Sequence, residues 1–208
     1  MHKQLAVLLL LLLIVGGFFL AKNTATAPTT DNEPTAPEPE VTERSYGVAR
    51  DAAFGYEFSY PDGPDGYLTF ENTDSTHPDF LTGIMLMDRT EYEILQASTD
   101  AREGPPAIHV QVYENPANRH APVWAMENQN ETNYGLMLGT ETETTLGGAN
   151  AIRYTTDGLY PIDTYVAAHD GRIYVLMGAY RDIGDQIHED FQDLVASFTF
   201  IQNSEPQG

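Results

Sequence analysis

The chain contains no cysteine among its 208 residues. Disulfide bonds, thiol nucleophiles, thiolate zinc sites and iron–sulfur clusters are therefore excluded, and so is a lipid anchor on cysteine. The fold must be stabilised by a hydrophobic core. About 160 residues after an N-terminal segment are enough to form such a core as one domain.

Positive charge is also scarce. Ten lysines and arginines stand against 31 aspartates and glutamates, which gives a net charge of −21 and a pI near 4.3, and the only lysines are Lys3 and Lys22. Nucleic acids and anionic membrane surfaces attract the opposite charge, so the sequence predicts no nucleic-acid binding. Two explanations of the acidity stay open: a solvated surface suited to salty surroundings, or the binding of a divalent cation such as calcium.

Sequence motifs of catalysis are missing as well. The chain has no nucleophilic serine elbow, no phosphate-binding glycine loop and no zinc-protease helix. No two of its histidines after residue 2 have the i, i+4 spacing that places two metal ligands on one helix face. These are His77, His109, His120, His169 and His188. The sequence therefore predicts no catalytic, cofactor-binding or metal-binding residue.

Two of these histidines have informative neighbours. His109 alternates with Ile108 and Val110, so we expect it on the strand face opposite the aliphatic residues, as part of a polar face or a pocket wall. His188 is expected beside an apolar helical stripe, close to Glu189 and Asp190.

The N-terminus carries a long apolar run. Leu5–Ala21 holds seventeen residues, and a membrane-spanning helix needs roughly 17–25. Ala25-Thr26-Ala27 has the small-x-small form of a signal-peptidase site, although Pro28 fits that protease poorly. The run is therefore either an uncleaved signal anchor or a signal peptide, and both place the rest of the chain outside the cytoplasm. The membrane is the first expected partner, through this segment.

The remaining chain divides by composition. A tract rich in proline, threonine and glutamate has no apolar periodicity and cannot bury enough surface to offset the entropy of ordering. The predicted organisation is a signal anchor or signal peptide over residues 1–21, a disordered linker over 22–45, a single α+β domain over 46–202 and a flexible tail over 203–208.

Short alternating runs bounded by Gly, Pro, Asn and Asp dominate the domain, which is the pattern of antiparallel strands. Aromatic residues occupy every second position from Phe54 to Tyr60. Two hairpin turns are expected, at Leu146-Gly147-Gly148-Ala149 and at His169-Asp170-Gly171-Arg172, the second with positive φ. Further strands are predicted at Leu81–Asp88, Ala107–Glu114, Met137–Leu146, Asn150–Thr156, Asp163–His169, Arg172–Tyr180 and Phe198–Gln202.

Three helices are predicted between the strands. Asp88 or Thr90 caps the first, which runs to about Ala97. The second begins near Pro122 and carries Val123, Trp124 and Met126. The third follows Asp185 as its cap and presents an apolar stripe. That stripe consists of Ile187, Phe191, Leu194 and Val195. The segregated order of strands and helices predicts an α+β fold with helices flanking an antiparallel sheet.

The start of the domain resembles that of PsbP-like domains, a family named for an extrinsic photosystem II protein. The matching residues are Tyr46-Gly47 and Phe54-Gly55-Tyr56-Glu57-Phe58-Ser59-Tyr60-Pro61-Asp62-Gly63. A tryptophan-bearing helix, a Gly-Gly hairpin and a last helix leading into Ser197-Phe198-Thr199-Phe200 follow in similar order, over about residues 46–202. The resemblance implies an α-β-α sandwich outside a membrane that acts as a binding or assembly module without catalysis. It transfers no functional residue to this chain.

Several residues remain as candidates for binding. Asp62-Gly63-Pro64-Asp65-Gly66 places two carboxylates in one turn, but it lacks the spacing of a calcium loop, and turn chemistry explains it equally well. Glu141 and Glu143 share one face of a strand. An aromatic concavity using Tyr60, Tyr113 or Tyr154 would favour a small ligand, although each tyrosine also fits core packing.

The sequence therefore predicts a membrane-tethered or secreted binding or assembly module without catalysis, with an unidentified envelope protein or small ligand as its partner. One alternative is an envelope hydrolase with an unrecognised carboxylate or histidine site. The other is a passive acidic surface or spacer domain.

Overall fold

A computed structural model describes residues 44–72, 75–99 and 103–201. The expected signal segment over 1–21, the linker up to residue 43 and the tail over 203–208 lie outside these residues. Within the described ranges, no helix has both the length and the apolar character needed to cross a membrane. All of the described residues belong to one compact unit.

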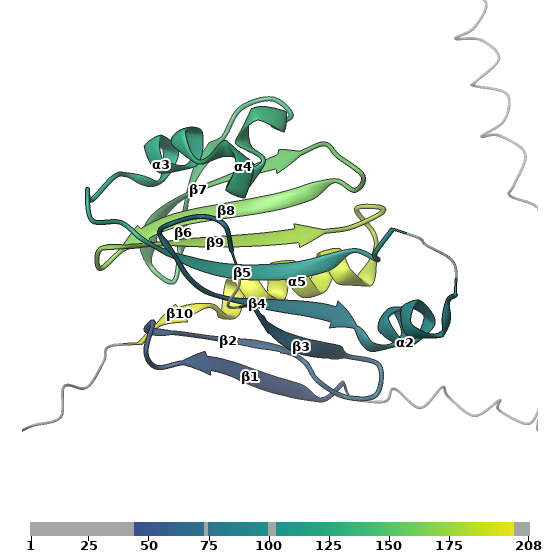
Figure 1. The fold of residues 1–208 in the computed structure, drawn as a ribbon. Coiled ribbons are helices and arrows are strands. Elements are labelled where there is room, and N and C mark those ends of the chain that lie inside the picture. The colour runs from purple at the N-terminus through teal and green to yellow at the C-terminus, as the bar shows by residue number, and fades with distance from the viewer. Residues whose placement is uncertain (1–43, 73–74, 100–102, 202–208) are drawn as a thin grey trace, which may run out of the picture. The chain divides into compact units, whose positions relative to one another are not determined.

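Most elements of this unit are β-strands, and helices occur at four places along it (Figure 1). The strands are β1 Tyr46–Asp51, β2 Tyr56–Pro61, β3 Tyr67–Asn72, β4 Phe80–Asp88, β5 Ala107–Glu114, β6 Thr142–Leu146, β7 Ala149–Thr156, β8 Ile162–His169, β9 Arg172–Ala179 and β10 Thr199–Phe200. The helices are α2 Arg89–Ala97, α3 Ala121–Glu127, α4 Gln129–Thr132 and α5 Gln186–Ser197, with a 3₁₀ turn, η1, at Tyr134–Leu136.

The strands form two antiparallel sheets. The small sheet has the order β1-β2-β10, and the large sheet has the order β3-β4-β5-β9-β8-β7-β6. The central strands β8 and β9 each bury four consecutive residues, because both faces of the large sheet are covered. This arrangement confirms the predicted α+β class with helices flanking an antiparallel sheet.

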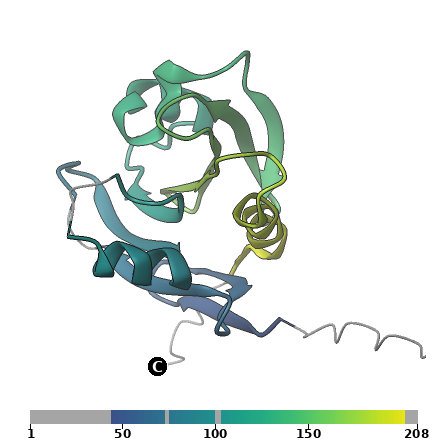
Figure 2. The same ribbon diagram turned by 90° about the vertical axis from the view of Figure 1, so that its right-hand side faces the viewer.

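Each face of the large sheet has its own hydrophobic core. On one face, α5 and the small sheet pack over Val110, Leu176 and their neighbours. On the other face, α3 places Trp124 against Tyr113 and Val175. Figure 2 shows α5 and the pair α3 and α4 on opposite sides of the large sheet. Trp124 is therefore a core residue.

Helix α5 is held closely against β9. Its predicted stripe lies in the first core, with Phe191 and Leu194 buried and Ile187 and Val195 packed beside them. A Cβ atom added to Gly178 would lie only 2.3 Å from Phe191 Cγ, so the glycine allows the aromatic ring to rest on the strand. Asp185 precedes the helix as expected, but its side chain makes no capping bond to it. Instead Asp185 Oδ2 accepts bonds from the preceding loop.

Most other local predictions are confirmed. Asp88, and not Thr90, caps α2, since its Oδ1 accepts a bond of 2.9 Å from the Glu91 N–H. The second predicted hairpin has positive φ at Asp170 (46°) and Gly171 (71°), as its primed turn requires. The first has positive φ at both of its glycines.

The prediction of a strand over Met137–Leu146 is wrong in its first half. Met137 makes only an isolated bridge, and regular pairing begins at Thr142. Gly139 lies between them with φ of +80°, a conformation that breaks a regular strand. The strands β1 and β3 lacked an individual sequence prediction. Both are edge strands with several exposed side chains, so their apolar pattern is weak.

Candidate functional site

One end of the large sheet brings together three connections. These are residues 136–140 before β6, residues 157–161 between β7 and β8, and residues 181–185 between β9 and α5. The first of them runs along the end of β7, where the Leu138 N–H donates to the Thr155 carbonyl at 2.8 Å. Loops held by a rigid sheet are common places for binding residues.

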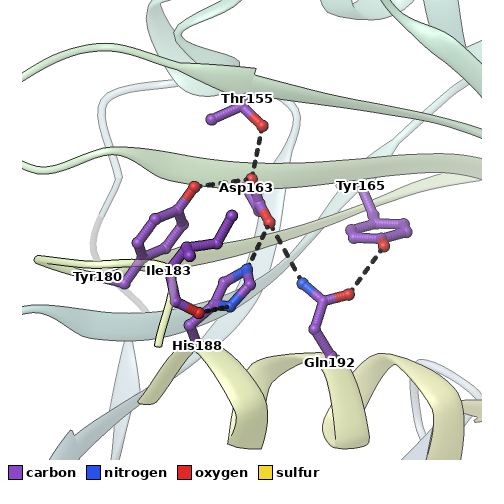
Figure 3. A network of polar contacts seen from close by, with 7 residues as sticks. All are labelled: Thr155, Asp163, Tyr165, Tyr180, Ile183, His188 and Gln192. Carbon is purple, nitrogen blue, oxygen red and sulfur yellow. Dashed lines mark hydrogen bonds and ion pairs between the residues drawn. The ribbon is translucent and has the colours of Figure 1, made fainter. Parts of the chain in front are cut away.

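Asp163 on β8 is the centre of a polar network beneath these loops (Figure 3). Its Oδ1 accepts bonds from the hydroxyls of Thr155 at 2.6 Å and Tyr180 at 3.3 Å. Its Oδ2 contacts His188 Nε2 at 3.1 Å and accepts a bond from Gln192 Nε2 at 3.2 Å. Both oxygens are thus occupied by groups from β7, α5 and the end of β9.

His188 extends the network into the loop before α5. Its Nδ1 lies 2.8 Å from the carbonyl oxygen of Ile183, while its Nε2 faces Asp163. Both partners accept hydrogen bonds, so neither ring nitrogen is directed at a hydroxyl nucleophile. The nearby Thr155 hydroxyl donates to Asp163 and not to the imidazole. A histidine that acts as a general base needs a bond to its nucleophile, and this arrangement does not provide one.

Gln192 completes the network. It lies one helical turn after His188, so the two side chains leave the same face of α5. Its Oε1 accepts a bond of 3.2 Å from the Tyr165 hydroxyl. The network therefore fixes α5 to β8 by paired polar contacts and stabilises the loop over residues 181–185.

The three connections also carry four large aliphatic side chains that are exposed to solvent, which we name the apolar loop patch. The patch consists of Leu136 (57 % exposed), Leu138 (57 %), Leu159 (61 %) and Ile183 (75 %). Beside it is a pocket of about 250 Å³ lined by Leu138, Arg153, Asp163 and Tyr165, among others. Exposed aliphatic side chains gathered on adjacent loops favour contact with a partner.

A second polar cluster surrounds the buried Asp190, which lies between His188 and Gln192 in the sequence but on another face of α5. The two terminal nitrogens of the Arg44 guanidinium donate to the Asp190 carboxylate, at 2.5 and 3.0 Å. The Tyr67 hydroxyl and Gln186 Nε2 donate to it at 2.8 and 3.1 Å. The bond to Asp190 raises the pKa of Arg44, and burial raises the pKa of Tyr67. Arg44 falls within the predicted linker, yet it contacts the folded unit.

The acidic candidates do not form a metal centre. In the turn of Asp62 to Gly66, Asp62 Oδ1 accepts a bond of 2.7 Å from the Ser45 hydroxyl. Glu141 and Glu143 line a pocket of about 520 Å³ together with His120. Over residues 44–72, 75–99 and 103–201, no group of three or more His, Cys, Asp and Glu side chains could hold a metal ion. Cation binding stays a prediction.

The tyrosine candidates do not converge. Tyr60 packs with the first core, on the face opposite Tyr113 and Tyr154. Tyr113 is buried and donates toward Glu131 at 3.2 Å, and Tyr154 donates to the Thr132 carbonyl at 3.0 Å. Burial raises the pKa of both phenols. The expected aromatic concavity is therefore not formed by these three residues, because two of them serve the core.

The histidines are also dispersed. His77 bonds to Asn128 at 2.9 Å, and His169 stacks on Phe200 at a centroid distance of 4.0 Å. His109 is half-buried on the face opposite Ile108 and Val110, as predicted. The partner of His188 is Asp163, 25 residues away, and not the adjacent acids in α5.

Sequence reasoning missed Asp163, Thr155 and Gln192. One signal was available: His188 and Gln192 are four residues apart beside the apolar stripe of α5, so their shared face had to meet something polar on the sheet. The sequence offered no means of choosing Asp163 among the other acids.

Comparison with protein-family models gives no match, and comparison with curated proteins gives none either. Comparison with solved structures gives the solution structure of cyanobacterial PsbP (CyanoP) from Synechocystis sp. PCC 6803. The two folds superpose with a TM-score of 0.51 at 16 % sequence identity, over 80 % of this chain and 99 % of that chain. The chain has a PsbP-like fold. The resemblance read from the sequence over about residues 46–202 is thus confirmed, and at this identity it concerns the fold alone.

Proposed function

We propose that this protein is a non-catalytic binding module that is held outside the cytoplasm by its N-terminal segment and docks a partner protein through the apolar loop patch. The observation that carries the proposal is the patch itself. Leu159 and Ile183 expose more than half of their side chains on neighbouring loops, although each could be replaced by a polar residue without loss to the core.

The size of the adjacent pocket favours a protein over a small molecule. Ligand pockets are generally about 300–1,000 Å³ and mostly apolar. The pocket beside Asp163 holds about 250 Å³ and is lined largely by threonine, arginine and aspartate. Exposed apolar side chains beside a polar pocket resemble the apolar centre and polar rim of a protein–protein interface.

The chemistry of the network supports a role without catalysis. Asp163 accepts hydrogen bonds at both oxygens, and His188 has an acceptor at each ring nitrogen. Side chains that are fully hydrogen-bonded in this way keep the adjacent loops rigid, and a rigid surface loses less conformational entropy on binding. The hydrolase alternative would need a free base or nucleophile at this position.

The binding proposal is tested by site-specific photo-crosslinking of the full chain in its native cells. A photoreactive amino acid is placed at Leu159 or Ile183, and in control chains at Val48 or Ile94, which are also well exposed but lie on β1 and α2. We expect one discrete higher-mass product from the two patch positions and none from the controls. Equal labelling at all four positions, or no product from the patch, contradicts the proposal.

The location is tested separately by cell fractionation and N-terminal sequencing. The proposal expects the folded unit to be digested by protease added outside the cytoplasmic membrane. A mature N-terminus at Met1 supports the signal anchor, whereas one that follows Ala27 supports cleavage and release. Complete protection from the added protease would contradict an extracytoplasmic location.

A further inference from the structure

The face of the large sheet that carries α3 has a row of two methionines around a histidine. Met85 on β4 is paired directly with His109 on β5, and His109 is paired directly with Met177 on β9. Directly opposed residues on neighbouring antiparallel strands project from the same face, with Cβ atoms about 4.5–5.5 Å apart. The imidazole therefore has a thioether side chain on each side of it.

The row is only partly covered. Met85, His109 and Met177 are each half-buried. Met87, two residues along β4 on the same face, is buried and brings a third thioether to the group. Methionine has three rotatable bonds, so its sulfur can move toward a bound ion at little cost.

The imidazole of His109 is available to a ligand. Within the part of the chain that the structure describes, it has no hydrogen bond, ion pair or ring contact. Burial lowers its pKa, which favours the neutral ring, and a neutral imidazole has one nitrogen with a free lone pair.

We propose that Met85, His109 and Met177 bind a single Cu(I) ion. Thioether sulfur and neutral imidazole are ligands that select Cu(I), and the row has no carboxylate that would favour calcium or magnesium. The next residues of the row are Phe70, paired with Met85, and Thr164, paired with Met177. The net charge of −21 raises the local concentration of cations around the chain.

The test is anaerobic titration of the full chain with Cu(I) against a coloured chelator that competes for the ion. We expect one Cu(I) per chain. The double variant Met85→Leu/Met177→Leu keeps the volume and apolar character of both side chains, so it should fold normally and bind at least about tenfold more weakly. His109→Gln should weaken binding to a similar extent.

Matched controls are the exposed Met126→Leu on α3 and the exposed His120→Gln before it, both of which should bind as the unaltered chain does. Silver(I) provides a second measurement on the unaltered chain, because it should shift the methyl NMR signals of Met85 and Met177 and leave that of Met126 in place. The proposal would be overturned if the chain failed to take Cu(I) from the chelator or if the double variant bound Cu(I) as tightly as the unaltered chain. It would also be overturned if silver(I) shifted the methyl signal of Met126 as much as those of Met85 and Met177.

Discussion

At the scale of single residues, Asp163 shows how one carboxylate can organise a loop end. It receives contacts from Thr155, Tyr180, His188 and Gln192, and its side chain is mostly buried. A buried charge of this kind is stable only while its partners remain. Asp163 therefore holds α5 and the loop before it in position.

Replacing Asp163 with asparagine should destabilise the protein by about 1–3 kcal/mol, because an amide nitrogen would face donors that now meet an oxygen. Thermal unfolding followed by circular dichroism measures the effect. The exposed Asp182→Asn on the neighbouring loop is the matched control and should change the melting temperature little. Equal melting temperatures for the two variants would show that the network contributes nothing to stability.

At the scale of elements, α5 is the helix that joins the two sheets. It packs on β2 of the small sheet and on β9 of the large one. Phe191 of α5 lies against Gly178 of β9, which is paired with Asp163 in the register. The polar network and the aromatic contact therefore fix the same part of the helix.

Gly178→Ala should destabilise the protein by about 1–3 kcal/mol, since the added methyl group would overlap the ring of Phe191. Urea denaturation gives the free energy of unfolding. Gly184→Ala, where an added Cβ meets nothing within 4 Å, is the control and should be neutral or slightly stabilising. The contact would prove unimportant if both variants unfolded at the same urea concentration.

The elements also show where sequence reasoning succeeds. The stripe of α5 and the alternating aromatics of β2 were predictable because burial on one face imposes a period on the chain. The error over Met137–Leu146 arose because apolar residues there do not alternate into a core: Leu138 stays exposed and Gly139 turns the backbone. The pairing of Asp163 with His188 was not predictable, since it depends on which strand α5 crosses.

At the scale of the whole molecule, the acidic composition is combined with a core rich in tyrosine. Burial raises the pKa of Tyr56, Tyr67, Tyr113 and Tyr154, and the hydrogen bond to Glu141 raises the pKa of Tyr134 to about 12. In the unfolded chain these phenols lose their protons near pH 10. The folded state thus retains more protons than the unfolded state in alkaline solution.

Stability should therefore be unaffected by these groups below about pH 10 and should fall as the pH rises above it. Tyrosinate absorbance and circular dichroism, followed together during an alkaline titration, check this expectation. The absorbance of the buried tyrosines should rise only as the fold is lost, and Tyr154→Phe should make the loss of stability less steep. Ionisation of these tyrosines in a protein with native circular dichroism would contradict it.

The ion pair between Arg44 and Asp190 has a mechanical consequence. Any tension that reaches the folded unit through the preceding chain arrives at Arg44 before it arrives at β1, which begins at Tyr46. Without the clamp, such a pull would open the hydrogen bonds of the edge strand β1 one after another. With it, the load passes to α5 and is shared by the core beneath that helix, so the unit resists being peeled open from its N-terminal end.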